Sequence, residues 1–201
     1  MNFLAHLYLS GNDSDIMIGN FIADSVKGKA YKKYRPKIQQ GILLHRKIDE
    51  FTDHHQITKN LKSLLVKAYS KHSGIVIDIF YDHFLSINWQ NFSSKSLESF
   101  IKVCHHIILK NIFTLPSEIK AYLPFFIMHK RLQSYSRIEG IENVLEVMSK
   151  YTSLPSETKS AIRILNEHYS LFNESFMIYF KELIYMVNEE LDKGSELIKS
   201  G

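Results

Sequence analysis

The amino-acid sequence predicts an all-α protein, folded as one helical bundle domain over residues 1–201. Only four prolines and eight glycines interrupt the chain, and this scarcity of turn-forming residues favours long helices. Apolar residues recur every three or four positions in several segments, a spacing that places side chains on one face of a helix. With 45% hydrophobic and 12% aromatic residues, the chain can also build a sizeable core.

The first strongly patterned segment is GILLHRKIDEFTDHH, residues 41–55, which we expect to be a helix. His45, Asp49 and Asp53 follow one another at intervals of four residues and would line a single face. The segment also contains the apolar residues Ile42, Leu43, Leu44, Ile48 and Phe51. The acidic face can therefore turn outward to water or inward to a metal ion, and the spacing alone does not choose between the two.

The next segment, residues 74–89, reads GIVIDIFYDHFLSINW and begins with β-branched residues that also suit a strand. We predict a helix, because no turn residue occurs from Ile75 to Trp89 and because Asp78 and Asp82 stand four apart. Residues 95–113, KSLESFIKVCHHIILKNIF, are predicted to form another helix.

The remaining helices are predicted in the C-terminal half. The sequence TLPSE at residues 114–118 is typical of a helix start, and a further helix is expected from about Ile141. In SLPSE, Ser153 can cap a helix and Pro155 fits its first turn. The helix that follows carries an apolar stripe, formed by Ile162, Leu165, Tyr169, Phe172, Phe176, Phe180, Leu183 and Val187.

Charge and cysteine content narrow the class of protein. The net charge of +4 and the pI of about 9.0 are too modest for a dedicated nucleic-acid binder. Residues 27–37, KGKAYKKYRPK, nevertheless concentrate Lys and Arg without an acid. This segment is either a solvated loop or a surface that attracts an acidic partner. Cys104 is the only cysteine, so an internal disulfide and a cysteine-based zinc site are excluded.

The N-terminal sequence MNFLAHLYLSGND is apolar but does not resemble a signal peptide. It has no basic residue before its apolar stretch, and His6 interrupts that stretch. Nowhere does the chain contain about 18 consecutive apolar residues, so no membrane-spanning helix is expected. We therefore expect a soluble, cytoplasmic protein without a membrane partner, and the sequence does not decide its oligomeric state.

Several acids and histidines stand in apolar surroundings in the first half of the chain. They are His6, Asp24, His45, Arg46, Asp49, Asp53, Asp82 and His83. Buried carboxylates need a cation, hydrogen bonds or a metal ion, and mixed imidazole and carboxylate donors suit zinc, manganese or iron. Each residue also has an ordinary structural reading: a hydrogen-bonded core histidine, a turn cap, a helical ion pair or a surface dipeptide. The P-loop, dinucleotide-binding and G-x-S-x-G motifs are absent.

Four segments carry a family resemblance. In order and spacing, MNFLAHLYLS, IGNFIADSVKG, GILLHRKIDEFTD and IFYDHFLSINW resemble the bacterial acyl carrier protein phosphodiesterase family, and RLQSYSRIEGIENVLEVMS continues the similarity. The resemblance implies an all-α hydrolase, similar to HD phosphohydrolases and using manganese. Such an enzyme releases 4′-phosphopantetheine from holo-acyl carrier protein. This chain departs from the HD pattern, since it has only Asp53–His54 and Asp82–His83 in reversed order.

We assign the metal ligands from their chemistry, because the HD dipeptide is missing. Asp24, His45 and Asp82 are the first candidates for ligands of a divalent ion, and Asp49 and His6 are the next. Under this interpretation the helix over residues 41–55 turns its acids inward.

Two further residues are candidates for catalysis. His83 is expected to act as general acid at the leaving serine oxygen, and Arg46 either clamps a phosphate oxygen or pairs with an aspartate. Residues 27–37 would then meet the acidic surface of the carrier protein. Two alternatives remain: a metal-dependent phosphohydrolase acting on a nucleotide or another small phosphoester, and a non-enzymatic helical binding protein.

Overall fold

The computed structural model describes residues 2–128 and 130–199, with side chains described as far as Lys193. All of the regular secondary structure in these residues is helical, which confirms the predicted all-α class. The α-helices are α1 (Phe3–Leu9), α2 (Ser14–Ile22), α3 (Pro36–His54), α4 (Gln56–Tyr69), α5 (Ser73–Ile87), α6 (Leu97–Lys110), α7 (Ser117–Met128), α8 (Arg131–Ser134), α9 (Ile138–Tyr151), α10 (Thr158–Glu167) and α11 (Tyr169–Lys199). Short 3-10 helices are η1 (Ala23–Ser25), η2 (Ala30–Lys33), η3 (Ser70–His72), η4 (Trp89–Asn91) and η5 (Ile112–Thr114).

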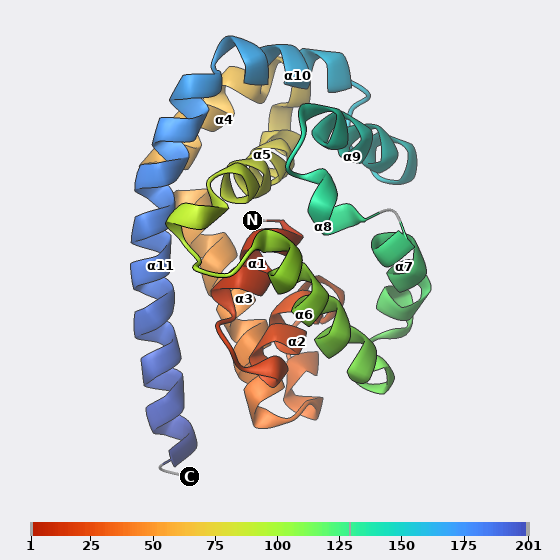
Figure 1. Ribbon diagram of the computed structural model, residues 1–201, viewed down its shortest axis with the longest axis vertical. Helices are drawn as coiled ribbons and strands as arrows, with labels where there is room; N and C mark the ends of the chain where they lie inside the picture. Colours follow the sequence, from red (N-terminus) through yellow and green to blue (C-terminus); the bar gives the residue numbers. More distant parts are fainter. Residues whose placement is uncertain (1, 129, 200–201) are drawn as a thin grey trace.

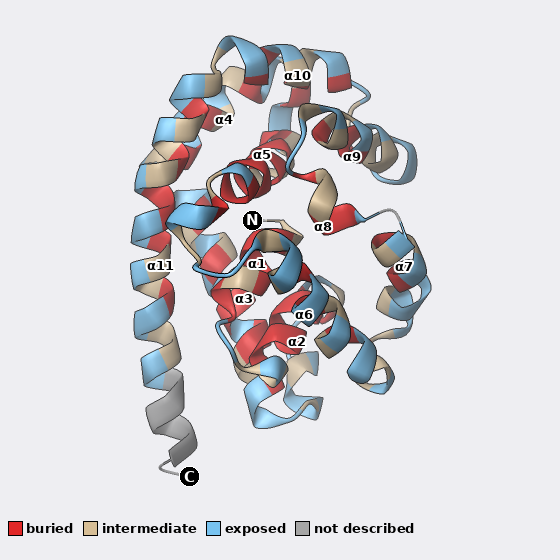
Figure 2. Cartoon of the chain, in the orientation of Figure 1, coloured by how far each residue is buried: buried red, intermediate tan, exposed pale blue. Residues whose placement is uncertain are grey.

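The helices surround a central α5. In Figure 1, α11 runs along one edge of the molecule, α7 lies at the opposite edge, and α5 lies between them in the upper part of the view. Figure 2 shows α5 as buried over most of its surface, whereas α11 is buried only along the side that faces the other helices. The segment that could have opened as a strand is therefore a helix, and its mostly apolar composition reflects burial on nearly all sides.

Helices α2 and α3 cross with their backbones in contact, at two glycines where no larger residue would fit. A Cβ atom on Gly19 would lie 2.1 Å from the carbonyl oxygen of Ile38, and one on Gly41 would lie 2.1 Å from that of Ile16. Only glycine fits at these two positions, because the two backbones touch there. The close crossing brings the end of α2 beside the middle of α3, where the candidate site lies.

Most of the predicted C-terminal apolar stripe is buried, with Ile162 and Tyr169 half-buried, but the helix that carries it is divided in two. Phe172, Phe176, Phe180, Leu183 and Val187 are buried on α11. The preceding helix α10 ends at Glu167, and it begins at Thr158, with Glu157 as N-cap. The prediction that Ser153 caps this helix and Pro155 lies in its first turn was therefore wrong. No helix among the described residues combines the length and the apolar character needed to span a bilayer.

Candidate functional site

The centre of the candidate site is His45 on α3, whose ring is oriented by Asn20 on α2. Nδ1 of His45 lies 2.9 Å from the carbonyl oxygen of Asn20 and 3.1 Å from its Oδ1. Both partners are acceptors, so Nδ1 carries the proton and donates it. The amide nitrogen of Asn20 in turn donates to the backbone oxygen of His6 at 2.9 Å and to Oγ of Ser10 at 3.0 Å. Nε2 of His45 therefore points away from Asn20, toward the acidic side chains.

His6 on α1 supplies a second imidazole beside the first. Its ring stacks on that of His45, with centroids 3.9 Å apart and planes inclined by 14°. Nε2 of His6 lies 3.2 Å from Oδ1 of Asp49, but the pair lacks the alignment of a hydrogen bond. Within the described part of the chain neither ring nitrogen of His6 has a hydrogen-bond partner, although the residue is only 3% exposed. A buried imidazole whose nitrogens make no hydrogen bond, with Nε2 close to a carboxylate, is what a metal ligand would leave when no ion is bound.

Two carboxylates complete the group. Oδ2 of Asp49 lies 3.1 Å from Nε2 of His45, and Oδ1 of Asp24 lies 3.3 Å from the same nitrogen. Asp49 follows His45 by one helical turn on α3, as its spacing predicted, whereas Asp24 lies in η1, just after α2. The face of α3 that carries His45 and Asp49 thus turns toward the other helices. Asp53, on the same helix, is exposed and pairs with Lys62 at 2.6 Å.

The charges of the four residues are strongly linked. Burial disfavours a charged His45, but the carboxylates of Asp24 and Asp49 outweigh burial and raise its pKa to about 9. Burial and the neighbouring His45 lower the pKa of His6 to about 4. Although burial opposes ionisation, the two histidines hold the pKa of Asp49 far below its usual range. Contact with His45 likewise lowers the pKa of Asp24. The group therefore holds a cationic imidazole between two carboxylates when no metal ion is present.

The donor set fits a divalent metal ion. One ligand atom from each of His6, His45 and Asp49 lies within 4.8 Å of the others. A hollow of about 30 Å³ is lined by His6, Asn20, Asp24 and His45 together with Asn2, Phe3 and Phe21. That volume holds a water-sized particle. Two imidazoles with carboxylate oxygens suit manganese, zinc or iron, and an acceptor on Nδ1 is the usual way to orient a ligating histidine.

A large cavity opens beside this cluster. It has a volume of about 820 Å³, and Asp24 and Asp49 form part of its lining. Its other lining residues are Asn2, Phe3, Thr52, Asp53, Ile75, Asp78, Ala121, Tyr122, Phe125, Arg131, Val147, Met148, Tyr151 and Thr152. The cavity therefore joins an acidic region to a largely apolar one, and its size is in the range of sites that bind small molecules and cofactors.

Asp82, expected among the ligands, lies outside the cluster. Its two carboxylate oxygens accept the backbone N–H groups of Leu4 at 2.8 Å and Ala5 at 3.0 Å, and the residue is 0% exposed. Asp82 therefore caps the first turn of α1 and holds the helix that carries His6. Burial raises its pKa to about 7 despite these two hydrogen bonds.

His83 and Arg46, the two expected catalytic residues, also have structural partners. Nδ1 of His83 donates to the backbone oxygen of Tyr135 at 2.7 Å, and its Nε2 accepts from the hydroxyl of Tyr169 at 2.8 Å. Arg46 donates to the carbonyl oxygens of Val26 and Gly28 at 2.8 and 2.9 Å. Neither residue lines the large cavity. Arg46 instead fixes the chain that follows Asp24.

Sequence reasoning overlooked two residues of the site, Asn20 and Arg131. A buried asparagine in the apolar run IMIGNFIAD was a signal for Asn20, because such a side chain must satisfy its amide. Arg131 had no comparable signal, since its burial depends on the turn between α7 and α8.

The fold and the cluster define the class of protein: an all-helical protein in which histidine and aspartate side chains border a cavity of about 820 Å³. The chain belongs to the acyl carrier protein phosphodiesterase family, whose model matches residues 1–183. It is 29% identical to the acyl carrier protein phosphodiesterase of Photorhabdus laumondii, over 96% of each chain. It is 27% identical to the protein of the same name from Yersinia enterocolitica, over 94% of this chain and 99% of the relative. No solved structure matches the chain significantly.

Proposed function

We propose that this protein is a metal-dependent phosphodiesterase that removes 4′-phosphopantetheine from holo-acyl carrier protein and leaves the apo-protein. The observation that carries the proposal is the cluster of His6, His45, Asp24 and Asp49 at the edge of a cavity of about 820 Å³. The names of the relatives supply the substrate, and the cluster supplies the chemistry.

The ion would be held by Nε2 of His45, by His6 and by the carboxylates of Asp49 and Asp24. Manganese follows from the family resemblance, and it suits these donors. A bound divalent ion would neutralise phosphodiester charge and lower the pKa of a coordinated water toward ~7. Asp82 is no longer a candidate ligand in this proposal, because both of its oxygens accept backbone N–H groups.

The protein's own residues then have defined tasks. Asn20 fixes the ring of His45 so that Nε2 faces the ion. Asp82 fixes the helix that carries His6, and Arg46 fixes the segment after Asp24 by binding two carbonyl oxygens. His83 has no part in proton transfer here, since both of its ring nitrogens are occupied away from the cavity.

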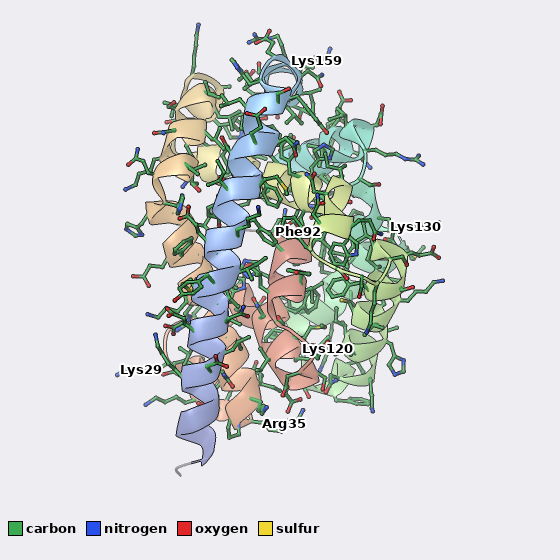
Figure 3. All side chains as sticks on the ribbon, turned by 60° about the vertical axis from the view of Figure 1, so that its left-hand side comes forward. Lys29, Arg35, Phe92, Lys120, Lys130 and Lys159 are labelled. Carbon is green, nitrogen blue, oxygen red and sulfur yellow. The ribbon has the colours of Figure 1, made fainter. Side chains whose placement is uncertain are left out.

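The basic segment, residues 27–37, is proposed to attract the acidic carrier protein. It follows Asp24 in the chain, and its side chains Lys29 and Arg35 lie toward the lower end of the molecule (Figure 3). Arg35 and Lys37 pair with Asp15 and Asp13 at 2.9 and 2.6 Å. The other four lysines of the segment, Lys27, Lys29, Lys32 and Lys33, are also exposed and have no carboxylate within 4.0 Å among the described residues. Unpaired surface charge of this kind raises the encounter rate with an oppositely charged partner.

Mass spectrometry of the carrier tests the proposed function. Incubated with holo-acyl carrier protein and manganese, the enzyme should release 4′-phosphopantetheine and leave the serine hydroxyl bare. A chelator should abolish the release, and Asp24→Ala should lower metal occupancy and slow the reaction while the helical circular-dichroism spectrum is unchanged. Glu98→Ala is the control, because it removes a surface carboxylate that pairs with Lys102 on α6, outside both the cluster and the basic segment. An unchanged carrier mass beside rapid hydrolysis of a small phosphoester would show that the substrate is wrong while the metal site stands.

A further inference from the structure

Arg131 is a buried cation in the wall of the large cavity. It begins the short helix α8, and the residue before it, Lys130, adopts the left-handed conformation with φ 47° and ψ 45°. Helix α8 packs against α6, α7 and α9, and Arg131 is only 6% exposed although its neighbour Lys130 is exposed. Arg131 is also the only lysine or arginine among the described residues that line the cavity.

Tyr135 holds the guanidinium in place. Nε of Arg131 donates to the hydroxyl of Tyr135 at 3.2 Å, and the guanidinium carbon lies 5.7 Å from the centre of the same ring. Tyr135 is 0% exposed, so its ring is enclosed by the core. In the described part of the chain no carboxylate oxygen lies within 4.0 Å of this guanidinium. A buried cation without a counter-ion is unfavourable, and an anionic ligand would relieve that cost.

The other side chains of the cavity suit a ligand with an anionic end and an organic body. Asp24 and Asp49 belong to the proposed metal site, which would itself attract a phosphoryl oxygen. The lining of the same cavity includes the apolar and aromatic residues Tyr122, Phe125, Val147, Met148 and Tyr151. Arg131 lines the same cavity as Asp24 and Asp49, so the anionic end of a ligand in this cavity can meet its guanidinium while the organic body lies along the apolar lining.

We infer that Arg131 is the anion-binding residue of this cavity, donating through its guanidinium to a non-bridging phosphoryl oxygen of the ligand. Arginine suits this task because its planar fork donates two parallel hydrogen bonds to a phosphate. Tyr135 is the residue that positions it. The identity of the ligand as a phosphopantetheine compound rests on the proposed function, whereas the anion site rests on the geometry alone.

The test compares two ligands that differ only in the phosphate. Calorimetry with chelator present should measure binding of 4′-phosphopantetheine and of pantetheine to the wild type and to Arg131→Gln. We expect the variant to lose about ten- to hundredfold in affinity for the phosphorylated ligand and to bind pantetheine as the wild type does. Arg131→Lys should lose less, because it keeps the charge but not the fork. Arg137→Gln, an exposed arginine six residues further along, should resemble the wild type.

Equal losses for both ligands, or no loss for either, would refute the assignment of Arg131. If Arg131→Gln does not fold, Arg131→Lys and Tyr135→Phe give the same comparison with smaller differences, and the absence of any selective loss in both overturns the inference. Inorganic phosphate separates this inference from the proposed function. Stabilisation by phosphate that depends on Arg131, without binding of 4′-phosphopantetheine, would keep the anion site and reject the substrate. If the Arg131 variants cleave holo-acyl carrier protein with unchanged kcat and KM, the proposed substrate is kept and the anion site at Arg131 is rejected.

Discussion

Replacement of Asn20 by leucine should weaken metal binding without touching a metal ligand. Leucine has a similar volume, but it removes the acceptor Oδ1 that lies 3.1 Å from Nδ1 of His45. The backbone oxygen of the same residue, at 2.9 Å, remains as an acceptor. Loss of an orienting partner typically lowers metal affinity by about 10- to 100-fold, and the remaining acceptor places our expectation near tenfold.

The same substitution should also lower stability. Asn20 donates to His6 and Ser10 at 2.9 and 3.0 Å, so leucine would leave two buried acceptors without this donor as well as removing one acceptor from His45. At about 1 kcal/mol for each neutral hydrogen bond, the free energy of unfolding should fall by roughly 2–3 kcal/mol. Denaturant unfolding of the metal-free protein measures this loss, and calorimetric titration with manganese measures the affinity.

A control variant separates orientation from general destabilisation. Asn88 lies at the end of α5, where its amide donates to Phe84 at 2.8 Å and to Asn173 at 2.7 Å. Asn88→Leu should therefore destabilise the fold by a comparable amount and leave manganese affinity unchanged. The reasoning is refuted if Asn20→Leu binds manganese like the wild type, or if Asn88→Leu weakens binding to the same extent.

Two further predictions concern the basic segment and the buried carboxyl group. Changing Lys32, Lys33 and Arg35 to glutamate should raise KM for the acidic carrier and reduce its salt dependence, with kcat little changed; steady-state kinetics at several ionic strengths would contradict us if KM stayed constant. For Asp82, a folded-state pKa of about 7 exceeds the unfolded value of ~3.9, so the folded protein binds this proton more tightly. The protonated Asp82 therefore contributes to the free energy of unfolding below pH ~4, and this stabilisation is lost as the pH rises through about 7. Asp82→Asn should remove this decline, and parallel unfolding curves from pH 5 to about 8 for both proteins would disprove the assignment.

The helical class could be predicted because the spacing of apolar residues within each of α3, α9 and α11 is enough to indicate a helix. The start of α10 could not be predicted in the same way. Ser153 and Pro155 form a good capping sequence, but the helix begins at Thr158. Capping sequences show where a helix can start, whereas packing decides which of the possible starts is used. The proposal of one domain over residues 1–201 stays a prediction, as does the similarity to HD phosphohydrolases.

The candidate site was predictable only where its residues share an element. His45 and Asp49 stand one turn apart on α3, and their common face follows from spacing. Asp82 was predicted to be a ligand for the same reason as His45 and Asp49, because it is a polar residue in an apolar stretch of sequence. Its oxygens instead accept N–H groups from α1, a contact between residues 78 positions apart in the chain. Composition therefore indicated correctly that each carboxylate needs a partner, but tertiary packing determined which partner each one has.

The geometry of the site depends on three residues that have no part in its chemistry. Gly19 and Gly41 let α2 and α3 touch along their backbones, which sets the distance between Asn20 and His45. Asp82 fixes the first turn of α1 and with it the position of His6. The two imidazole rings then stack 3.9 Å apart, with each Nε2 within 3.2 Å of an oxygen of Asp49. Backbone contact and a helix cap are both stiff constraints, so the donors are already arranged before any ion binds, and binding requires little further ordering of the chain.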